Sequence, residues 1–217
     1  MKRLLFLGAV CLLVGCSNAT ATYRLAFKTN NAEEQQELIK ESLLVMERRL
    51  ESMGEKLKRQ EVSSSSGTTI TIAASSKEAL DALTQHLQET FNLHIMEETT
   101  AEEAEVTVEG QGSFKETGIT EQDFLWAQSR KNELTGLGEA RLVCTEEGRQ
   151  KMKELFKRSK GKNIGIFVRG QLVSKLFVQN DVFEGNIQIS GIPDPELAAV
   201  FTDDVNVGIN VSFTPVP

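Results

Sequence analysis

The chain has 217 residues, with 31 acidic and 24 basic side chains, a net charge of −7 and three cysteines. This acidic balance argues against nucleic acid as a partner, because affinity for the phosphate backbone comes from Lys and Arg. Three cysteines cannot build a disulfide framework, so a hydrophobic core must stabilise the fold, and a chain of this length can bury one.

The N-terminus has the pattern of a secretory signal. Lys2 and Arg3 precede an apolar run over residues 4–15. As a helix this run spans roughly 18 Å, which is shorter than the roughly 30 Å hydrocarbon core of a bilayer. We therefore predict a cleaved signal peptide over residues 1–15 rather than a membrane span.

The signal ends in Leu13-Val14-Gly15-Cys16, which resembles the lipobox of bacterial lipoproteins. The resemblance implies cleavage before Cys16 and a diacylglyceryl lipid on its thiol, which would tether the chain to a membrane through residues 16–21. Ser17 resembles lipoproteins sorted to an outer membrane. The alternative is an ordinary signal peptide in which Cys16 is incidental. The expected location is the cell envelope, lipid-anchored and facing the periplasm or the exterior.

Residues 22–98 alternate strand and helix patterns. The alternation of Tyr23, Leu25 and Phe27 predicts a strand, and a long helix follows, capped by Asn30 or Asn31. A second helix starts after Ser76. Further strands are predicted at residues 55–62, 69–73 and 93–96, and the helical stripes consist of Ile39, Leu43, Met46, Leu50, Met53, Leu80, Leu83, Leu87 and Phe91.

This order predicts a ferredoxin-like βαββαβ base domain over residues 22–98, with both helices on one face of a four-stranded sheet. Leu93 and Ile95 would face the helices, and His94 would lie on the open face. Four glutamates mark residues 99–109 as an acidic linker. Residues 110–217 form a second α+β part. Its expected helices are capped by Thr145 and begin at Pro195, a hairpin is expected to turn at Arg169-Gly170, and the expected strands are 141–144, 164–168, 171–178, 186–190 and 209–213.

Several motifs of this second part resemble, in order, the head of the first periplasmic domain of SecD, a subunit of the bacterial protein-export translocase. They are Thr117-Gly118-Ile119-Thr120 with Asp123, Thr145-Glu146-Glu147-Gly148, Gly161-Lys162-Asn163-Ile164 leading into residues 166–170, Val173-Ser174, and residues 185–191. Arg48-Arg49-Leu50-Glu51-Ser52-Met53-Gly54 also resembles the end of a helix in that family's ferredoxin-like base.

The resemblance implies a SecD-type head over residues 110–217 and a periplasmic surface that meets exported polypeptide. Two positions depart from the family: Arg169 replaces an aspartate in the hairpin, and Leu176 replaces a proline. The membrane bundle that houses the family's proton path has no counterpart in this sequence, so proton-driven export is not implied.

No pattern of residues predicts catalysis, a cofactor or a metal site. His86 and His94 have no ligand at metal-binding spacing, and the serines at 63–66 lie in an expected turn. Cys144 ends an apolar stretch and is expected in the core. The adjacent Asp203 and Asp204 are expected to be solvated, and the glycine pairs 110/112 and 136/138 lack the context of a phosphate loop.

Three hypotheses follow for function. The first is a non-catalytic binding module, tethered at Cys16, that meets exported polypeptides, translocase subunits or other envelope proteins. The alternative is a structural or assembly lipoprotein of the envelope without an export role. The third is a hydrolase that the sequence patterns do not reveal. Fold resemblance by itself does not decide between them.

Overall fold

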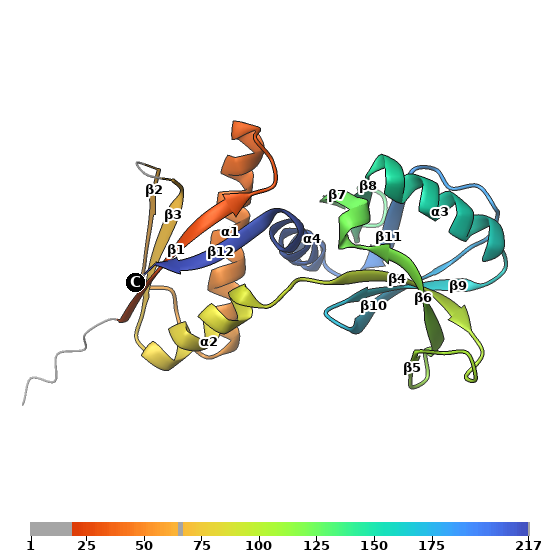
Figure 1. The fold of residues 1–217 in the computed structure, drawn as a ribbon, viewed down its shortest axis with the longest axis horizontal. Helices are drawn as coiled ribbons and strands as arrows, with labels where there is room; N and C mark the ends of the chain where they lie inside the picture. The colour runs from red at the N-terminus through yellow and green to blue at the C-terminus, as the bar shows by residue number, and fades with distance from the viewer. Residues whose placement is uncertain (1–18, 65–66, 217) are drawn as a thin grey trace, which may run out of the picture.

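The computed structural model describes residues 19–64 and 67–216. The chain forms two lobes with a helix between them (Figure 1). The predicted signal peptide and Cys16 lie outside the described residues, whereas residues 19–21, expected in the tether, already belong to the first strand. Within these described residues, no helix combines the length and the hydropathy of a membrane span.

The base lobe, on the left of Figure 1, is a four-stranded antiparallel sheet with two helices on one face. Its strand order is β12-β1-β3-β2. The helices pack on the sheet through a core that includes Tyr23, Met46 and Leu83. The elements are β1 (Ala19–Phe27), α1 (Ala32–Ser52), β2 (Arg59–Ser63), β3 (Thr69–Ala74), α2 (Lys77–Gln88) and β12 (Val211–Val216).

Capping residues in the sequence correctly predicted where the two helices of this lobe begin. The Asn31 side chain accepts hydrogen bonds from the backbone N–H groups of Glu33 and Glu34 and so caps α1. Ser76 caps α2 in the same way, through the N–H of Ala79. Gly54 follows α1 with a φ of +78°, a conformation that glycine adopts without steric cost.

The fourth strand of the base sheet is not the one expected from the sequence. Residues 93–96 belong to β4 (Leu93–Thr99), which pairs with two strands of the other lobe. The place beside β1 is taken by β12, in which Phe213 lies opposite Leu25. The ferredoxin-like strand order is kept, but the chain leaves the base after α2 and returns more than a hundred residues later. Strand pairing across such a separation depends on the tertiary fold and has no local signal.

The head lobe contains two sheets and one helix. A five-stranded sheet has the order β10-β9-β4-β6-β5, and a three-stranded sheet has the order β11-β8-β7. They enclose a core with α3 that includes Leu142, Met152 and Ile166. The elements are β5 (Val106–Val108), β6 (Gly112–Thr120), β7 (Phe124–Lys131), β8 (Gly138–Cys144), α3 (Glu146–Arg158), β9 (Asn163–Val168), β10 (Gln171–Phe177) and β11 (Asn186–Ile192), with a 3-10 turn η1 (Glu121–Asp123) before β7.

The expected acidic linker at 99–109 is a connection inside the head lobe, so this expectation was wrong. Thr99 pairs with Ser113, and Val106 pairs with Phe114. Strands β6 and β7 were also missed, because few of their side chains are buried and polar residues interrupt the hydrophobic alternation. The expected hairpin turn at Arg169-Gly170 is confirmed, with positive φ at both residues.

Helix α4 (Pro195–Asn210) lies between the lobes and leads into β12 (Figure 1). Pro195 occupies its first turn, as the sequence predicted, and Asp194 caps it. Val205 and Ile209 belong to the head core, whereas Val207 belongs to the base core. One helix therefore contributes to both cores.

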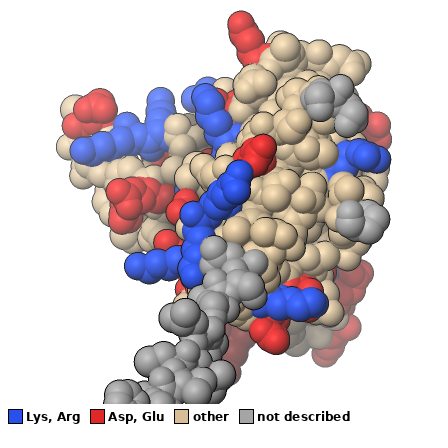
Figure 2. Space-filling model, turned by 90° about the vertical axis from the view of Figure 1, so that its left-hand side faces the viewer, with Lys and Arg blue, Asp and Glu red and all other residues tan. Residues whose placement is uncertain are grey.

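Within residues 19–64 and 67–216, no helix or strand packs on the face of the base sheet opposite its helices. Thr22 and Thr71 pair across β1 and β3 there, and their hydroxyl groups are 2.9 Å apart. Figure 2, which views the base lobe from this side, shows acidic and basic side chains interspersed with uncharged surface. This face has no single sign of charge.

Candidate functional site

A groove runs between helix α1 and the outer face of the three-stranded sheet. It consists of two adjoining hollows of about 470 and 1120 Å³, which share Glu37, Trp126 and Gln128. The smaller hollow reaches Gln188 on β11, and the larger one reaches Lys28 after β1. Both lobes therefore form the walls of this groove.

Trp126 lies at the centre of the groove and is the only tryptophan of the chain. A bulge in β7 precedes it: Phe124 pairs with Cys144 and Trp126 with Val143, which leaves Leu125 as the extra residue. Leu125 is 55% exposed and lines the larger hollow. Trp126 is half-buried against the base core, so an indole ring and an exposed leucine give the groove an apolar middle.

Helix α4 holds the edge of β7 in place beside the groove. The Asn206 side chain bonds both backbone groups of Ala127, and Asn210 Nδ2 donates to the carbonyl of Leu125 at 3.2 Å. Asn206 is 1% exposed. The amides of α4 therefore satisfy backbone groups that would otherwise be unpaired at a strand edge.

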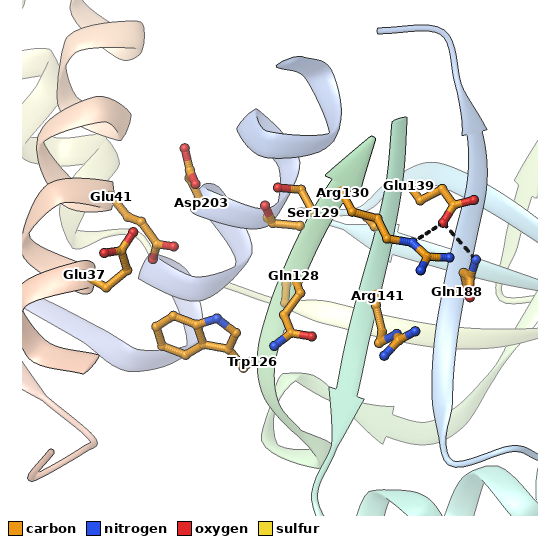
Figure 3. Close-up of a pocket in the computed structure, with 13 residues that line it drawn as sticks. Glu37, Glu41, Trp126, Gln128, Ser129, Arg130, Glu139, Arg141, Gln188 and Asp203 are labelled. Atoms are coloured by element: carbon orange, nitrogen blue, oxygen red, sulfur yellow. Dashed lines mark hydrogen bonds and ion pairs between the residues drawn. The ribbon is translucent and has the colours of Figure 1, made fainter. Parts of the chain in front are cut away.

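One end of the groove is acidic. Glu37 and Glu41 lie one turn apart on α1, and Asp203 faces them from α4, with Trp126 nearby (Figure 3). Glu41 is 8% exposed, and its Oε1 accepts a hydrogen bond from Asn206 Nδ2 at 3.0 Å. Burial raises the pKa of Glu41 to about 7; the Asn206 bond opposes this shift, and the charges of Asp203 and Glu37 add to it.

The other end of the groove is built around Glu139 on β8. Its carboxylate accepts hydrogen bonds from Arg130 Nε at 2.5 Å and from Gln188 Nε2 at 3.2 Å (Figure 3). Asn132 Nδ2 also donates to it, at 2.8 Å. The Asn132 and Arg130 bonds lower the pKa of Glu139. Arg141 is exposed and lines the same end.

Asp203 and Asp204 were expected to be solvated, and the structure corrects this. Arg48 Nη1 lies 2.8 Å from Asp203, and Arg49 Nη2 lies 2.9 Å from Asp204. Arg169, the residue that departs from the SecD pattern, pairs with the same Asp204 at 3.2 Å. Asp204 thus connects α1, α4 and the β9–β10 turn.

The remaining cysteine and the two histidines lie outside the groove. Cys144 is fully buried, as predicted, and burial raises the pKa of its thiol to about 11. His86 is exposed on α2. His94 was expected on the base sheet but lies in the head lobe, with Nδ1 2.9 Å from Glu116 Oε1. Within residues 19–64 and 67–216, no three His, Cys, Asp or Glu side chains group so as to hold a metal ion.

Sequence reasoning missed the groove, although one signal pointed to it. Leu38, Glu41, Ser42 and Val45 recur at the spacing of a buried helical face, and all four are buried. A glutamate at such a position is unusual, because burial of a carboxylate is costly without partners. Trp126 gave no corresponding signal, because its surroundings come from segments distant in the chain.

Comparisons with known proteins give a likeness in structure. No protein-family model and no curated protein matches this chain. The chain resembles SecDF in structure. A SecDF described as a membrane component that enhances protein export is 14% identical with a TM-score of 0.48, and the match covers 92% of this chain and 99% of that one.

Two longer SecDF chains give the same likeness. A SecDF in a super-membrane-facing form is 15% identical with a TM-score of 0.49, over 92% of this chain and 30% of that one. SecDF from Thermus thermophilus, described as a translocon-associated membrane protein, is 14% identical with a TM-score of 0.48. That match covers 89% of this chain and 30% of the other. This chain thus spans about 30% of these two. With TM-scores below 0.5 the likeness says nothing about activity or partners, which have to be inferred from the groove.

Proposed function

We propose that this protein is a lipid-anchored envelope protein that binds exported polypeptides without catalysis, and that the groove centred on Trp126 is the binding site. The lipid would be attached at Cys16, so that the described lobes face the periplasm or the exterior. The SecD-like motifs of the sequence agree with such a role.

The groove is the observation that carries the proposal. Its middle presents Trp126 and Leu125, and its ends present carboxylates, amides and arginines. Ligand sites commonly combine an apolar surface with a few convergent polar groups, and indole rings are frequent anchors in protein interfaces. An unfolded chain offers both apolar side chains and unpaired backbone groups, so it matches this combination.

The single tryptophan makes the test direct. The mature lipidated protein, in detergent micelles, is titrated with a tryptophan-free secreted protein kept unfolded by reduction and carboxymethylation. We expect a saturable blue shift of Trp126 emission, and no shift with the same secreted protein in its native, folded state. Absence of a shift with the unfolded protein would refute the proposed site.

A crosslinking experiment in cells gives an independent check. A photoreactive residue at Gln128 in the groove is compared with one at Lys160, which is exposed beyond the end of α3 and does not line the groove. The Gln128 probe is expected to trap a chosen, epitope-tagged exported polypeptide during its passage, and the Lys160 probe is not. Equal trapping at both positions would indicate non-specific contact and count against the proposal.

The second candidate is a structural or assembly lipoprotein of the envelope. The ion pairs of Asp204 with Arg49 and Arg169 favour it, because they tie α1, α4 and the head hairpin together. Under this alternative, deletion of the protein would leave secretion rates intact and would alter the composition of an envelope complex. Measuring both quantities in one deletion strain separates the two functions.

A further inference from the structure

The Glu41 carboxylate has an unused hydrogen-bonding capacity at the acidic end of the groove. Its Oε1 accepts from Asn206, whereas its Oε2 is buried and has no hydrogen-bond partner among the residues that the structure describes. A carboxylate oxygen left unpaired in a buried position is costly, and a donor placed beside it would recover that cost. Glu41 lines the smaller hollow, where Figure 3 shows it on the same side as Glu37 and across from Trp126.

The cations around Glu41 are already engaged by other carboxylates. On α1, Lys40 pairs with Glu37 at 3.1 Å, and Arg48 pairs with Asp203 of α4 at 2.8 Å. On β7, Arg130 pairs with Glu139 of β8. Arg141 of β8 lines the opposite end of the hollow, beside Gln188 (Figure 3).

We infer that the acidic end of the groove receives the cationic side chain, lysine or arginine, of a polypeptide segment bound across Trp126. This inference rests on the proposed function, since it names the class of segment that the same groove selects. The ammonium or guanidinium group would donate to Glu41 Oε2, and the indole ring would contact the alkyl stem and the charge. The Glu37 side chain is 53% exposed, and its ion pair with the exposed Lys40 costs little to break, so Glu37 can change rotamer and open the path to Glu41.

Proton release accompanies the binding of such a cation. Without ligand, Glu41 has a pKa of about 7, so a large share of it is protonated at neutral pH. A bound cation stabilises the carboxylate and lowers that pKa. The affinity for a cationic segment is therefore expected to increase from pH 6 to pH 8, and the affinity for an uncharged segment is not.

The test uses two peptides of identical extended, apolar sequence that carry either lysine or norleucine at the central position. Binding to the full-length protein in micelles is followed by Trp126 emission and by calorimetry at pH 6 and pH 8. We expect the lysine peptide to bind at least about tenfold more tightly than the norleucine peptide at pH 8, as one charge-assisted hydrogen bond would give. The isosteric Glu41→Gln variant is expected to reduce this ratio below twofold and to abolish its dependence on pH.

Glu51→Gln serves as the matched control, because it removes the same charge from an exposed position at the end of the same helix. It is expected to keep the tenfold ratio. Free lysine amide is a further control and is expected to bind far more weakly than the lysine peptide. If it binds equally well, a small amine and not a polypeptide segment is the ligand, and the inference is wrong.

The remaining outcomes separate this inference from the proposed function. If both peptides bind wild-type protein equally well, selection of a cation is refuted while polypeptide binding stands. If neither peptide binds, the selection of a cationic segment is refuted. If the unfolded secreted protein does not bind either, the proposed function is refuted as well. If Glu41→Gln is folded, as its circular dichroism would show, and retains the full preference for lysine, another group receives the cation and the inference is overturned.

Discussion

The Asn206 side chain takes the place of a neighbouring strand beside Ala127. Its Oδ1 accepts a hydrogen bond from the Ala127 N–H at 2.6 Å, and its Nδ2 donates to the Ala127 carbonyl at 3.0 Å. The second Nδ2 hydrogen is directed to Glu41, so one buried amide joins α4, β7 and α1. The position of the groove wall depends on this residue.

We predict that Asn206→Ala lowers the free energy of unfolding by about 2–4 kcal/mol, because it leaves buried backbone groups of Ala127 without partners. Urea unfolding of the full-length protein measures the change. Asn186→Ala, at an exposed position on β11, is the control and is expected to change it by less than about 0.5 kcal/mol. Equal effects of the two substitutions would contradict the role assigned to Asn206.

The raised pKa of Glu41 predicts how stability depends on pH. Its folded-state pKa of about 7 exceeds the ordinary value of 4.5, so the folded protein binds more protons than the unfolded one between these values. The contribution of Glu41 to stability should therefore fall as pH rises from about 4.5 to about 7. Glu41→Gln removes this dependence and is expected to stabilise the protein at pH 8, by an amount on the order of 2 kcal/mol, with little effect at pH 4.

Urea unfolding at the two pH values is the measurement, with Glu51→Gln as the charge-matched control. The prediction concerns the difference between the two pH values, so that unrelated effects of the substitution cancel. A Glu41→Gln protein whose stability depends on pH as the wild type does would show that Glu41 does not titrate in this range.

The two arginines that pair with Asp204 differ in burial, so loss of the two ion pairs should lower stability by different amounts. Arg169 is 37% exposed, so Arg169→Ala should cost about 0.5 kcal/mol of stability. Arg49 is 15% exposed, and Asp204→Ala leaves it without its carboxylate partner, which should cost about 1–2 kcal/mol. Thermal melts of both variants test this order of stability losses. Lys40→Ala, which removes the exposed Lys40–Glu37 ion pair, is the reference. A larger loss of stability in Arg169→Ala than in Asp204→Ala would contradict the greater weight given to the buried Arg49 pair.

The C-terminal strand completes the base sheet, so its removal should unfold the base lobe. A chain that ends at Asn210 loses the partner of β1 together with Phe213, whose ring packs at 6.5 Å from that of Tyr23. We expect the near-ultraviolet circular dichroism of the aromatic residues to weaken strongly. The full-length Ser212→Ala and Thr214→Ala variants, changed at exposed positions of β12, should keep the native spectrum. A truncated chain with a native base would mean that another strand closes the sheet.

Lipid attachment at Cys16 remains a prediction. Cys16→Ser is expected to lose labelling by radioactive fatty acid and to retain residues 1–15, as mass spectrometry of the purified protein would show. Cys144→Ser, which changes only a buried core thiol, should be labelled as the wild type is. Labelling that persists in Cys16→Ser would place the lipid elsewhere or argue for an ordinary signal peptide.

The sequence by itself determined the local features of the fold. Helix caps at Ser76 and Thr145 and the turn at Arg169-Gly170 depend on residues within a few positions of each other, and all three are found as predicted. The cap of the first helix was predicted at Asn30 or Asn31, and Asn31 forms it. The α+β class followed from the same alternation of short elements. Such features are local because a cap or a tight turn is stabilised by hydrogen bonds and backbone preferences inside one segment.

Only the tertiary structure decided which strands pair and what the groove contains. Residues 93–96 and 211–216 both suit the edge of the base sheet, and the choice between them depends on packing against segments far along the chain. The carboxylate of Glu41 accepts a hydrogen bond from Asn206, 165 residues away in the sequence, and lines the same hollow as Trp126. No periodicity encodes such a meeting, because long-range contacts arise only when the separate cores assemble.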